Sequence, residues 1–121
     1  MKVVYIAGPY MGATHDGKSF FQINTNIMFA REWAKKVFQL GAFAFCPHLN
    51  SYHMELDVDA DADFWRKADL EILSRCDAIL LIPGWENSRG SVLERTFAID
   101  NSIPVFSSEN ELKDWLNGDV K

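Results

Sequence analysis

The sequence predicts an α/β fold in which a parallel sheet of four or five strands lies between two layers of helices. Two segments, VVYIAG at residues 3–8 and DAILLIPG at residues 77–84, are continuous apolar runs that end at glycine or proline. Such runs are typical of strands buried on both faces of a parallel sheet. Between them, apolar residues recur at alternating spacings of three and four from Phe20 to Val37, which predicts a strongly amphipathic helix. Strand and helix patterns then alternate to the end of the chain, so we expect right-handed crossovers and a single three-layer Rossmann- or flavodoxin-like domain.

The other elements follow from the same patterns. Gly41 ends the first helix, and the capping box SENE, which begins at Ser108, opens a last helix that ends near residue 118. Between these, the patterns predict a strand at 42–47, an acidic loop at 48–63, a helix at 63–75, a helix at 91–101 and a strand at 103–106. We expect Cys76 to be a buried thiol on the apolar face of the helix at 63–75. The helix at 91–101 should bury Val92, Leu93, Phe97 and Ala98.

Length and composition narrow the class of protein. The chain has 121 residues, enough for one domain over residues 1–121 with little room for a second. Its net charge of −5 argues against binding to a nucleic-acid polymer, and its apolar runs are shorter than the roughly 20 residues of a membrane span. Two cysteines without CxxC spacing are too few for a disulfide scaffold, so we expect a cytoplasmic protein.

Metal and cofactor sites are not indicated by the motifs. Cys46, His48 and His53 lie close together in the sequence but lack the paired spacing of a zinc site, so loop histidines are the better interpretation. The acidic run ELDVDADAD lacks the central glycine and the closing glutamate of a calcium loop. GPYMG matches neither GxGxxG nor GxxxxGK, so we expect no cofactor.

A site is expected where three loops meet at the carboxyl ends of the strands. These loops cover residues 8–19, 46–63 and 83–91, and ligands of such sheets bind at that edge. The third loop, PGWENSRG, leads into a helix N-terminus, where free N–H groups favour an anion. Ser88 adds a hydroxyl, and Gly90 allows a ligand to approach the backbone. The candidate substrate-binding residues of the three loops are Gly8, Pro9, Tyr10, His48, Ser88 and Gly90.

Two carboxylates are candidates for chemistry. Glu94 lies in the first turn of the helix expected at 91–101, where it is either a nucleophile or base facing the cleft, or an acid that complements the helix dipole. The sequence alone favours neither of these two interpretations over the other. Asp69 borders the apolar face of its helix, and taken alone it is more often a solvated acid. Tyr5 and Tyr10 could stack on a base or a sugar, although an aromatic in a strand is more often part of the core.

Three segments in this order and spacing resemble the nucleoside 2-deoxyribosyltransferase superfamily, which includes the 2′-deoxynucleoside 5′-monophosphate N-glycosidases. They are VYIAGPY, DLEILSRCDAILLIPGW and SRGSVLE, and the resemblance covers about residues 3–106. It implies an enzyme that cleaves the N-glycosidic bond of a (2′-deoxy)nucleoside or its 5′-monophosphate. It also implies that Glu94 is the nucleophile that forms a covalent glycosyl-enzyme, and that Asp69 and Tyr5 are its catalytic partners.

The resemblance also bears on the substrate. Monophosphate hydrolases of this superfamily tend to have serine where nucleoside transferases have aspartate, so Ser88 implies a 5′-monophosphate. The loop after the first strand departs from the hydrolases, because it offers Lys18 and no arginine. Water as acceptor would give hydrolysis and a second base would give transfer, while a non-catalytic nucleotide-binding module remains a further alternative. The resemblance implies a homodimer and a small nucleoside or nucleotide as substrate.

Overall fold

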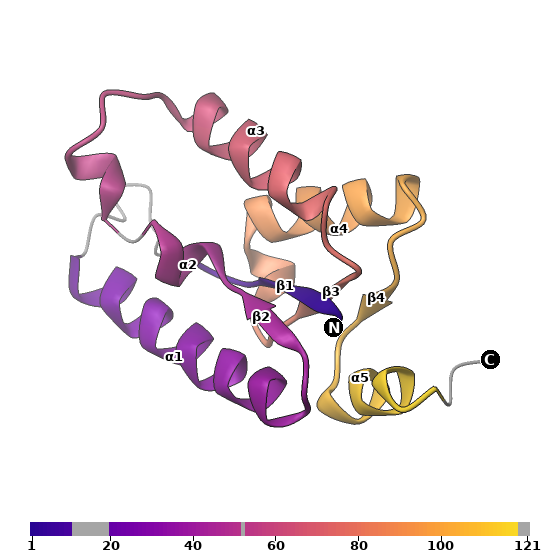
Figure 1. The fold of residues 1–121 in the computed structure, drawn as a ribbon. Coiled ribbons are helices and arrows are strands. Elements are labelled where there is room, and N and C mark those ends of the chain that lie inside the picture. The colour runs from indigo at the N-terminus through magenta and orange to yellow at the C-terminus, as the bar shows by residue number, and fades with distance from the viewer. Residues whose placement is uncertain (11–19, 52, 119–121) are drawn as a thin grey trace.

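The protein has the α/β fold that the sequence predicts. The structure is a computed structural model that describes residues 1–10, 20–51 and 53–118, and Figure 1 shows its sheet between two layers of helices. The four strands of the described residues are all parallel and lie in the order β2-β1-β3-β4. Their bounds are β1 Val3–Ala7, β2 Phe43–Phe45, β3 Ala78–Leu81 and β4 Val105–Phe106. The larger helices are α1 Phe20–Gln39, α3 Ala62–Leu73, α4 Arg89–Asp100 and α5 Glu109–Leu116.

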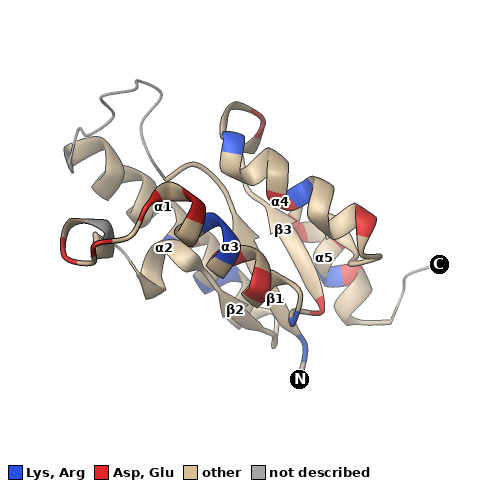
Figure 2. Cartoon of the chain, turned by 90° about the horizontal axis from the view of Figure 1, so that it is seen from above, with Lys and Arg blue, Asp and Glu red and all other residues tan. Residues whose placement is uncertain are grey.

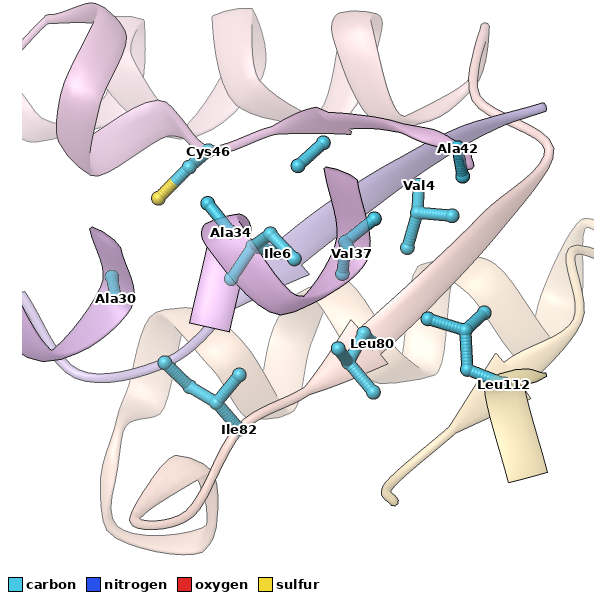
Figure 3. Packing of buried hydrophobic residues seen from close by; sticks show 11 residues of the cluster. Val4, Ile6, Ala30, Ala34, Val37, Ala42, Cys46, Leu80, Ile82 and Leu112 are labelled. Carbon is cyan, nitrogen blue, oxygen red and sulfur yellow. The ribbon is translucent and has the colours of Figure 1, made fainter. Parts of the chain in front are cut away.

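Two apolar cores hold the layers together. Helices α1 and α5 cover one face of the sheet, and α3 and α4 cover the other (Figure 1). Side chains alternate along β1, so Val4 and Ile6 join the core under α1 and α5, whereas Tyr5 joins the core under α3 and α4. Figure 3 shows the first core, in which Ala30 of α1 and Leu112 of α5 approach the sheet from their own helices. The side chain of Phe20, predicted as part of this core, lies outside the described residues.

The strand order creates a switch point between β1 and β3. The chain leaves β1 through α1 toward β2 on one side, and it returns through α3 to β3 on the other side. Ligands of doubly wound sheets bind outside the carboxyl ends of the strands at such a point. The candidate binding residues follow these strands: Gly8, Pro9 and Tyr10 follow β1, His48 follows β2, and Ser88 and Gly90 follow β3. Of the expected loop at 8–19, residues 11–19 with Lys18 lie outside the described residues.

Helix α4 begins earlier than the sequence predicts. It starts at Arg89, two residues before the expected start. The cause is the side chain of Ser88, which accepts a hydrogen bond from the N–H of Ser91 and so caps the helix. Glu94 is therefore the sixth residue of the helix and lies in its second turn, not its first. The helix dipole acts mainly within the first turn, so this placement weakens the interpretation of Glu94 as a dipole-complementing acid.

Both loops at 46–63 and 83–91 contain short helices that the sequence analysis did not predict. The first holds α2 Pro47–Asn50 and the 3-10 helix η1 Met54–Leu56, and the second holds the 3-10 helix η2 Trp85–Asn87. Proline at the first position of α2 is favourable there, because it has no N–H to leave unpaired. These short helices fix the positions of the residues at the carboxyl edge of the sheet.

Three burial predictions are wrong. Val92 and Leu93 are exposed on α4, while Phe97 is partly buried and Ala98 is fully buried as expected. The buried residues of α4 are Ser91 and Ala98. The apolar side of this helix is therefore narrower than the sequence predicts. Cys76 follows the end of α3 and is partly exposed, and its thiol donates to the carbonyl of Ile72.

Charged side chains of both signs are mixed on the surface. Figure 2 shows blue and red segments interspersed along α3 and α4, and acidic residues in the segment before α3. Asp63 of α3 pairs with Arg66 and Lys67 of the same helix, and Glu71 pairs with Arg75, which follows the helix. Within the residues that the structure describes, no helix is both long enough and apolar enough to cross a membrane.

Gly8 lies where β1 passes closest to the segment that follows β3. A Cβ added to Gly8 would lie 2.4 Å from Cγ1 of Ile82, which is fully buried. We therefore expect Gly8→Ala to lower the free energy of unfolding by about 1–3 kcal/mol through overpacking. Gly90→Ala is the matched control, because a Cβ at Gly90 meets nothing within 4 Å. Urea unfolding of the two variants checks this, and equal stabilities would contradict it.

Candidate active site

A hydrogen bond between residues 89 positions apart defines the candidate site. The hydroxyl of Tyr5, on β1, donates to Oε2 of Glu94, on α4, at 2.5 Å. Tyr5 is fully buried in the core under α3 and α4, and Glu94 is partly buried. The bond orients one oxygen of the Glu94 carboxyl group and leaves the other without a hydrogen bond from Tyr5. The structure thus brings together two of the three residues predicted as catalytic.

Asp69, the third of these residues, lies on α3 beside the pair. It is partly buried, and its charge acts on both Tyr5 and Glu94. Burial raises the pKa of Asp69 from 3.8 to about 6. Burial also raises the pKa of Glu94 from 4.5 to about 8, and the Tyr5 hydrogen bond opposes that rise while the charge of Asp69 adds to it. Two carboxyl groups with separated pKa values are typical of an acid and base pair in catalysis.

Stability should fall as the pH rises across the range in which Glu94 ionises. The pKa of Glu94 is higher in the folded state than the ordinary 4.5, so the folded state binds more protons between pH 4.5 and about 8. The free energy of unfolding then decreases through that window. Glu94→Gln removes the ionisation and keeps an oxygen that accepts from Tyr5. We expect it to raise the free energy of unfolding at pH 8 by about 1–2 kcal/mol and to change it little at pH 4.5. Urea unfolding at both pH values checks this, and a variant as pH-sensitive as the wild type would contradict it.

Phe45 is a site neighbour that the sequence analysis missed. It stands opposite Tyr5 in the parallel pairing of β1 with β2, and the centroids of the two rings are 5.9 Å apart. The ring of Phe45 is partly exposed, whereas that of Tyr5 is fully buried. The signal that could have found it is its place at the end of β2, on the same face of the sheet as Tyr5.

The N-terminus of α4 offers hydrogen-bond donors six residues before Glu94. Oγ of Ser88 accepts from the N–H of Ser91 at 3.2 Å and from its hydroxyl at 3.0 Å. Both lone pairs of Ser88 are then in use, so its own hydroxyl hydrogen remains to be donated. The N–H groups of Arg89 and Gly90 have no acceptor within the helix. Ser91 is fully buried and was not singled out from the sequence.

The segment after β1 lies against residues of two other elements, α1 and α2. The carbonyl of Pro9 is 2.7 Å from Nε2 of His48, and the ring of Tyr10 meets the ring of His48 edge-on at 5.3 Å. Asn26 donates to the carbonyl of Tyr10. His48 is 6% exposed. The structure therefore brings Pro9, Tyr10 and His48 together in a second group, and it places Ser88 and Gly90 at the N-terminus of the helix that carries Glu94.

No group of three or more His, Cys, Asp or Glu side chains within the described parts of the chain is arranged to hold a metal ion.

Cys46 directly follows β2 and is buried. Burial raises the pKa of its thiol to about 11, and the charge of Glu94 contributes to the rise. The end of β2 therefore lies within electrostatic range of Glu94.

An apolar hollow of about 440 Å³ lies elsewhere, between α1 and α2. Its lining residues are Asn24, Ile27, Met28, Arg31 and Leu49. None of these residues belongs to the group around Glu94, and the hollow offers no pair of acids. The residues that the sequence predicts as catalytic therefore lie away from this hollow.

Comparison with known proteins defines the family and supports the fold. The chain belongs to the family described as a domain of unknown function, DUF4406, which matches residues 2–107. Among solved structures, the chain is similar to a 2-deoxyribosyltransferase from the psychrotolerant bacterium Bacillus psychrosaccharolyticus, with a TM-score of 0.59 and 17% identity. That similarity covers 93% of this chain and 90% of the other. No curated protein matches the chain. The resemblance found in the sequence is thus confirmed at the level of the fold.

Proposed function

We propose that the protein cleaves the N-glycosidic bond of a (2′-deoxy)nucleoside 5′-monophosphate through a covalent intermediate on Glu94. The observation that carries this proposal is the partly buried carboxyl group of Glu94, held by the Tyr5 hydroxyl at 2.5 Å and near the charge of Asp69. A carboxylate fixed in this way suits attack on an anomeric carbon, because departure of the base leaves an oxocarbenium-like sugar that a carboxylate stabilises and traps.

The reaction divides into two displacements. In the first, an oxygen of the Glu94 carboxylate bonds to the anomeric carbon, the C–N bond breaks, and its electron pair leaves with the base. Asp69, whose pKa is about 6, supports the protonation of the departing base. In the second, water attacks the same carbon and gives its proton to the Asp69 carboxylate, while the bond to Glu94 breaks and its electron pair returns to the Glu94 carboxylate. A second base in place of water makes the reaction a transfer.

The helix N-terminus is the proposed phosphate site. The Ser88 hydroxyl and the N–H groups of Arg89 and Gly90 form a set of donors at the positive end of the α4 dipole. With a rise of 1.5 Å per residue, Glu94 lies about 9 Å further along the helix axis than Ser88. Gly90 leaves open space beside the backbone, which an anion can enter.

Transfer between bases is the second candidate. The structurally similar protein is a 2-deoxyribosyltransferase described as a biocatalyst for nucleoside synthesis, which favours a sugar acceptor other than water. Both reactions use the same first displacement on Glu94. They differ only in what enters the site after the first base has left.

Free-base release from a panel of nucleosides and 5′-monophosphates tests the proposed function. Chromatography should detect release from 2′-deoxynucleoside 5′-monophosphates without added base. Release that requires a second base would identify a transferase. A wild-type protein that binds intact nucleotides and releases no base would be the non-catalytic nucleotide-binding module, and the proposal would fail.

The hydrogen bond from Tyr5 to Glu94 should influence how kcat/KM depends on pH. Burial raises the pKa of Glu94 to about 8, and the hydrogen bond from Tyr5 keeps it from rising further. The catalytically active carboxylate forms as the pH rises, so kcat/KM should increase up to about pH 8. Tyr5→Phe removes the bond, raises this pKa further and should lower kcat/KM at pH 7 by about tenfold. The check is kcat/KM from pH 5 to 10, and an unmoved acidic limb in the variant would count against it.

We also propose that the protein is a cytoplasmic homodimer. Helices α3 and α4 pack against each other and expose the large apolar side chains of Phe64, Val92, Leu93 and Ile99. Apolar surface of this kind is typical of an interaction face. Sedimentation of the wild type beside Leu93→Glu tests this. A dimer that the substitution weakens is the expected result, and a wild-type monomer at all concentrations would contradict the proposal.

A further inference from the structure

Both nitrogens of the His48 ring are closed to a ligand. Nε2 lies 2.7 Å from the carbonyl oxygen of Pro9, so the position from which it would contact a substrate is occupied. Nδ1 is buried and has no hydrogen-bond partner among the residues that the structure describes. The whole residue is 6% exposed. A histidine in this environment has no accessible polar atom with which to bind a nucleotide, so a role at the site must act through another residue.

The hydrogen bond to Pro9 also fixes the chemical form of the ring. A carbonyl oxygen only accepts, so Nε2 must carry the hydrogen. Burial lowers the pKa of His48 below 6.5, although the backbone of Pro9 and Gly8 opposes that change. The neutral ring with hydrogen on Nε2 is the form that satisfies the bond without placing a second, unpaired N–H at Nδ1.

Several contacts converge on the two residues that His48 meets. The N–H of His53 donates to the Tyr10 hydroxyl at 2.8 Å, and Asn26 of α1 donates to the Tyr10 carbonyl at 2.9 Å. Pro9 also borders the segment after β3, since a Cβ added to Gly84 would lie 3.1 Å from its Cγ. These contacts place Pro9 between α2 and the segment that leads to α4.

We propose that His48 is a positioning residue that holds the Gly8-Pro9-Tyr10 segment against the candidate active site through its Nε2–H bond to the Pro9 carbonyl. The sequence alone predicts His48 as a direct substrate contact, and the closed ring nitrogens favour the indirect role. Only the kinetic part of this proposal rests on the proposed function. The state of the ring and the order of the segment are independent of any activity.

The test compares His48→Leu, which has no donor, with His48→Gln, whose amide N–H can replace Nε2–H. His53→Asn is the matched control, because it removes a neighbouring histidine ring and leaves the Pro9 carbonyl bonded. Three measurements are made on each protein: nitrogen NMR of the histidine rings at pH 7, hydrogen exchange of the Tyr10 amide, and KM and kcat for base release.

We expect His48 of the wild type to be neutral with hydrogen on Nε2. In His48→Leu, the exchange rate of the Tyr10 amide and the KM should each rise by about tenfold, while kcat stays within about threefold of the wild-type value. His48→Gln should restore both, and His53→Asn should resemble the wild type. The proposal is overturned by a ring with hydrogen on Nδ1 only, by unchanged exchange and KM in His48→Leu, or by a failure of glutamine to restore them. If the wild type releases no base, the proposed function fails, and the ring state and the exchange still decide this proposal.

Discussion

Replacing Glu94 with alanine should lower the rate of base release by about four orders of magnitude, because it removes the group that bonds to the anomeric carbon. Release should be followed by chromatography with a 2′-deoxynucleoside 5′-monophosphate at saturating concentration. Glu94 is partly buried and its only side-chain hydrogen bond in the described part of the chain is the one from Tyr5, so the fold should survive its loss. Circular dichroism and thermal unfolding establish that the variant is folded.

Glu94→Gln separates the anion from the hydrogen bond. Its amide oxygen can still accept from the Tyr5 hydroxyl, but it cannot act as a nucleophile. We expect this variant to be as inactive as Glu94→Ala and at least as stable as the wild type at pH 8. If either variant retained a rate near that of the wild type, Glu94 would not be the nucleophile.

Asp69→Asn should produce the second largest loss, a fall in kcat of about 10²–10⁴-fold, because it removes the titratable group that supports departure of the base. The loss should be smaller for a substrate whose base is a better leaving group, since such a base needs less assistance. The charge of Asp69 also raises the pKa of Glu94. The acidic limb of kcat/KM should therefore move to lower pH in the residual activity of the variant.

Glu71→Gln is the matched control for Asp69→Asn. Glu71 lies two residues further along α3, is exposed, and pairs with Arg75 at 2.8 Å. Its replacement removes an acid from the same helix without touching the candidate site. Steady-state kinetics of the two variants should differ by at least about 100-fold. Equal and small effects would show that Asp69 has no part in the chemistry.

The parts of the fold that the sequence predicts well are those with strong periodicity. The apolar runs around Tyr5 and Leu80 coincide with β1 and β3, and the three-and-four spacing from Ile23 to Val37 coincides with the buried face of α1. These patterns are strong because a strand buried on both faces must be apolar throughout, and a helix on a sheet must be apolar on one side.

Other features depend on interactions that a pattern does not contain. The start of α4 is set by one side-chain bond from Ser91 to Ser88, which sequence periodicity cannot resolve. The short helices α2 and η1 contain too few residues to show a period. Val92 and Leu93 are apolar and exposed, and their exposure follows from the rotation of α4 on the sheet rather than from their own chemistry.

The candidate site was predictable in part. Glu94, Asp69 and Tyr5 are named from the sequence by resemblance, and the structure joins Tyr5 to Glu94 through a hydrogen bond across 89 positions of the chain. The sequence alone leaves the role of Glu94 undecided, because a carboxylate near a helix start has a purely electrostatic explanation. Phe45 was not found, because its importance lies in its register opposite Tyr5.

The most direct test of the central claim is to trap the sugar on Glu94. A 2′-fluorinated deoxynucleoside 5′-monophosphate should slow the second displacement, because the electron-withdrawing fluorine destabilises the oxocarbenium-like transition state. After a burst of about one equivalent of free base, peptide mass spectrometry should find the sugar phosphate on the peptide that contains Glu94, and it should be absent from Glu94→Gln. Continued release of base with Glu94 unmodified, or a sugar attached to a different residue, would contradict the account.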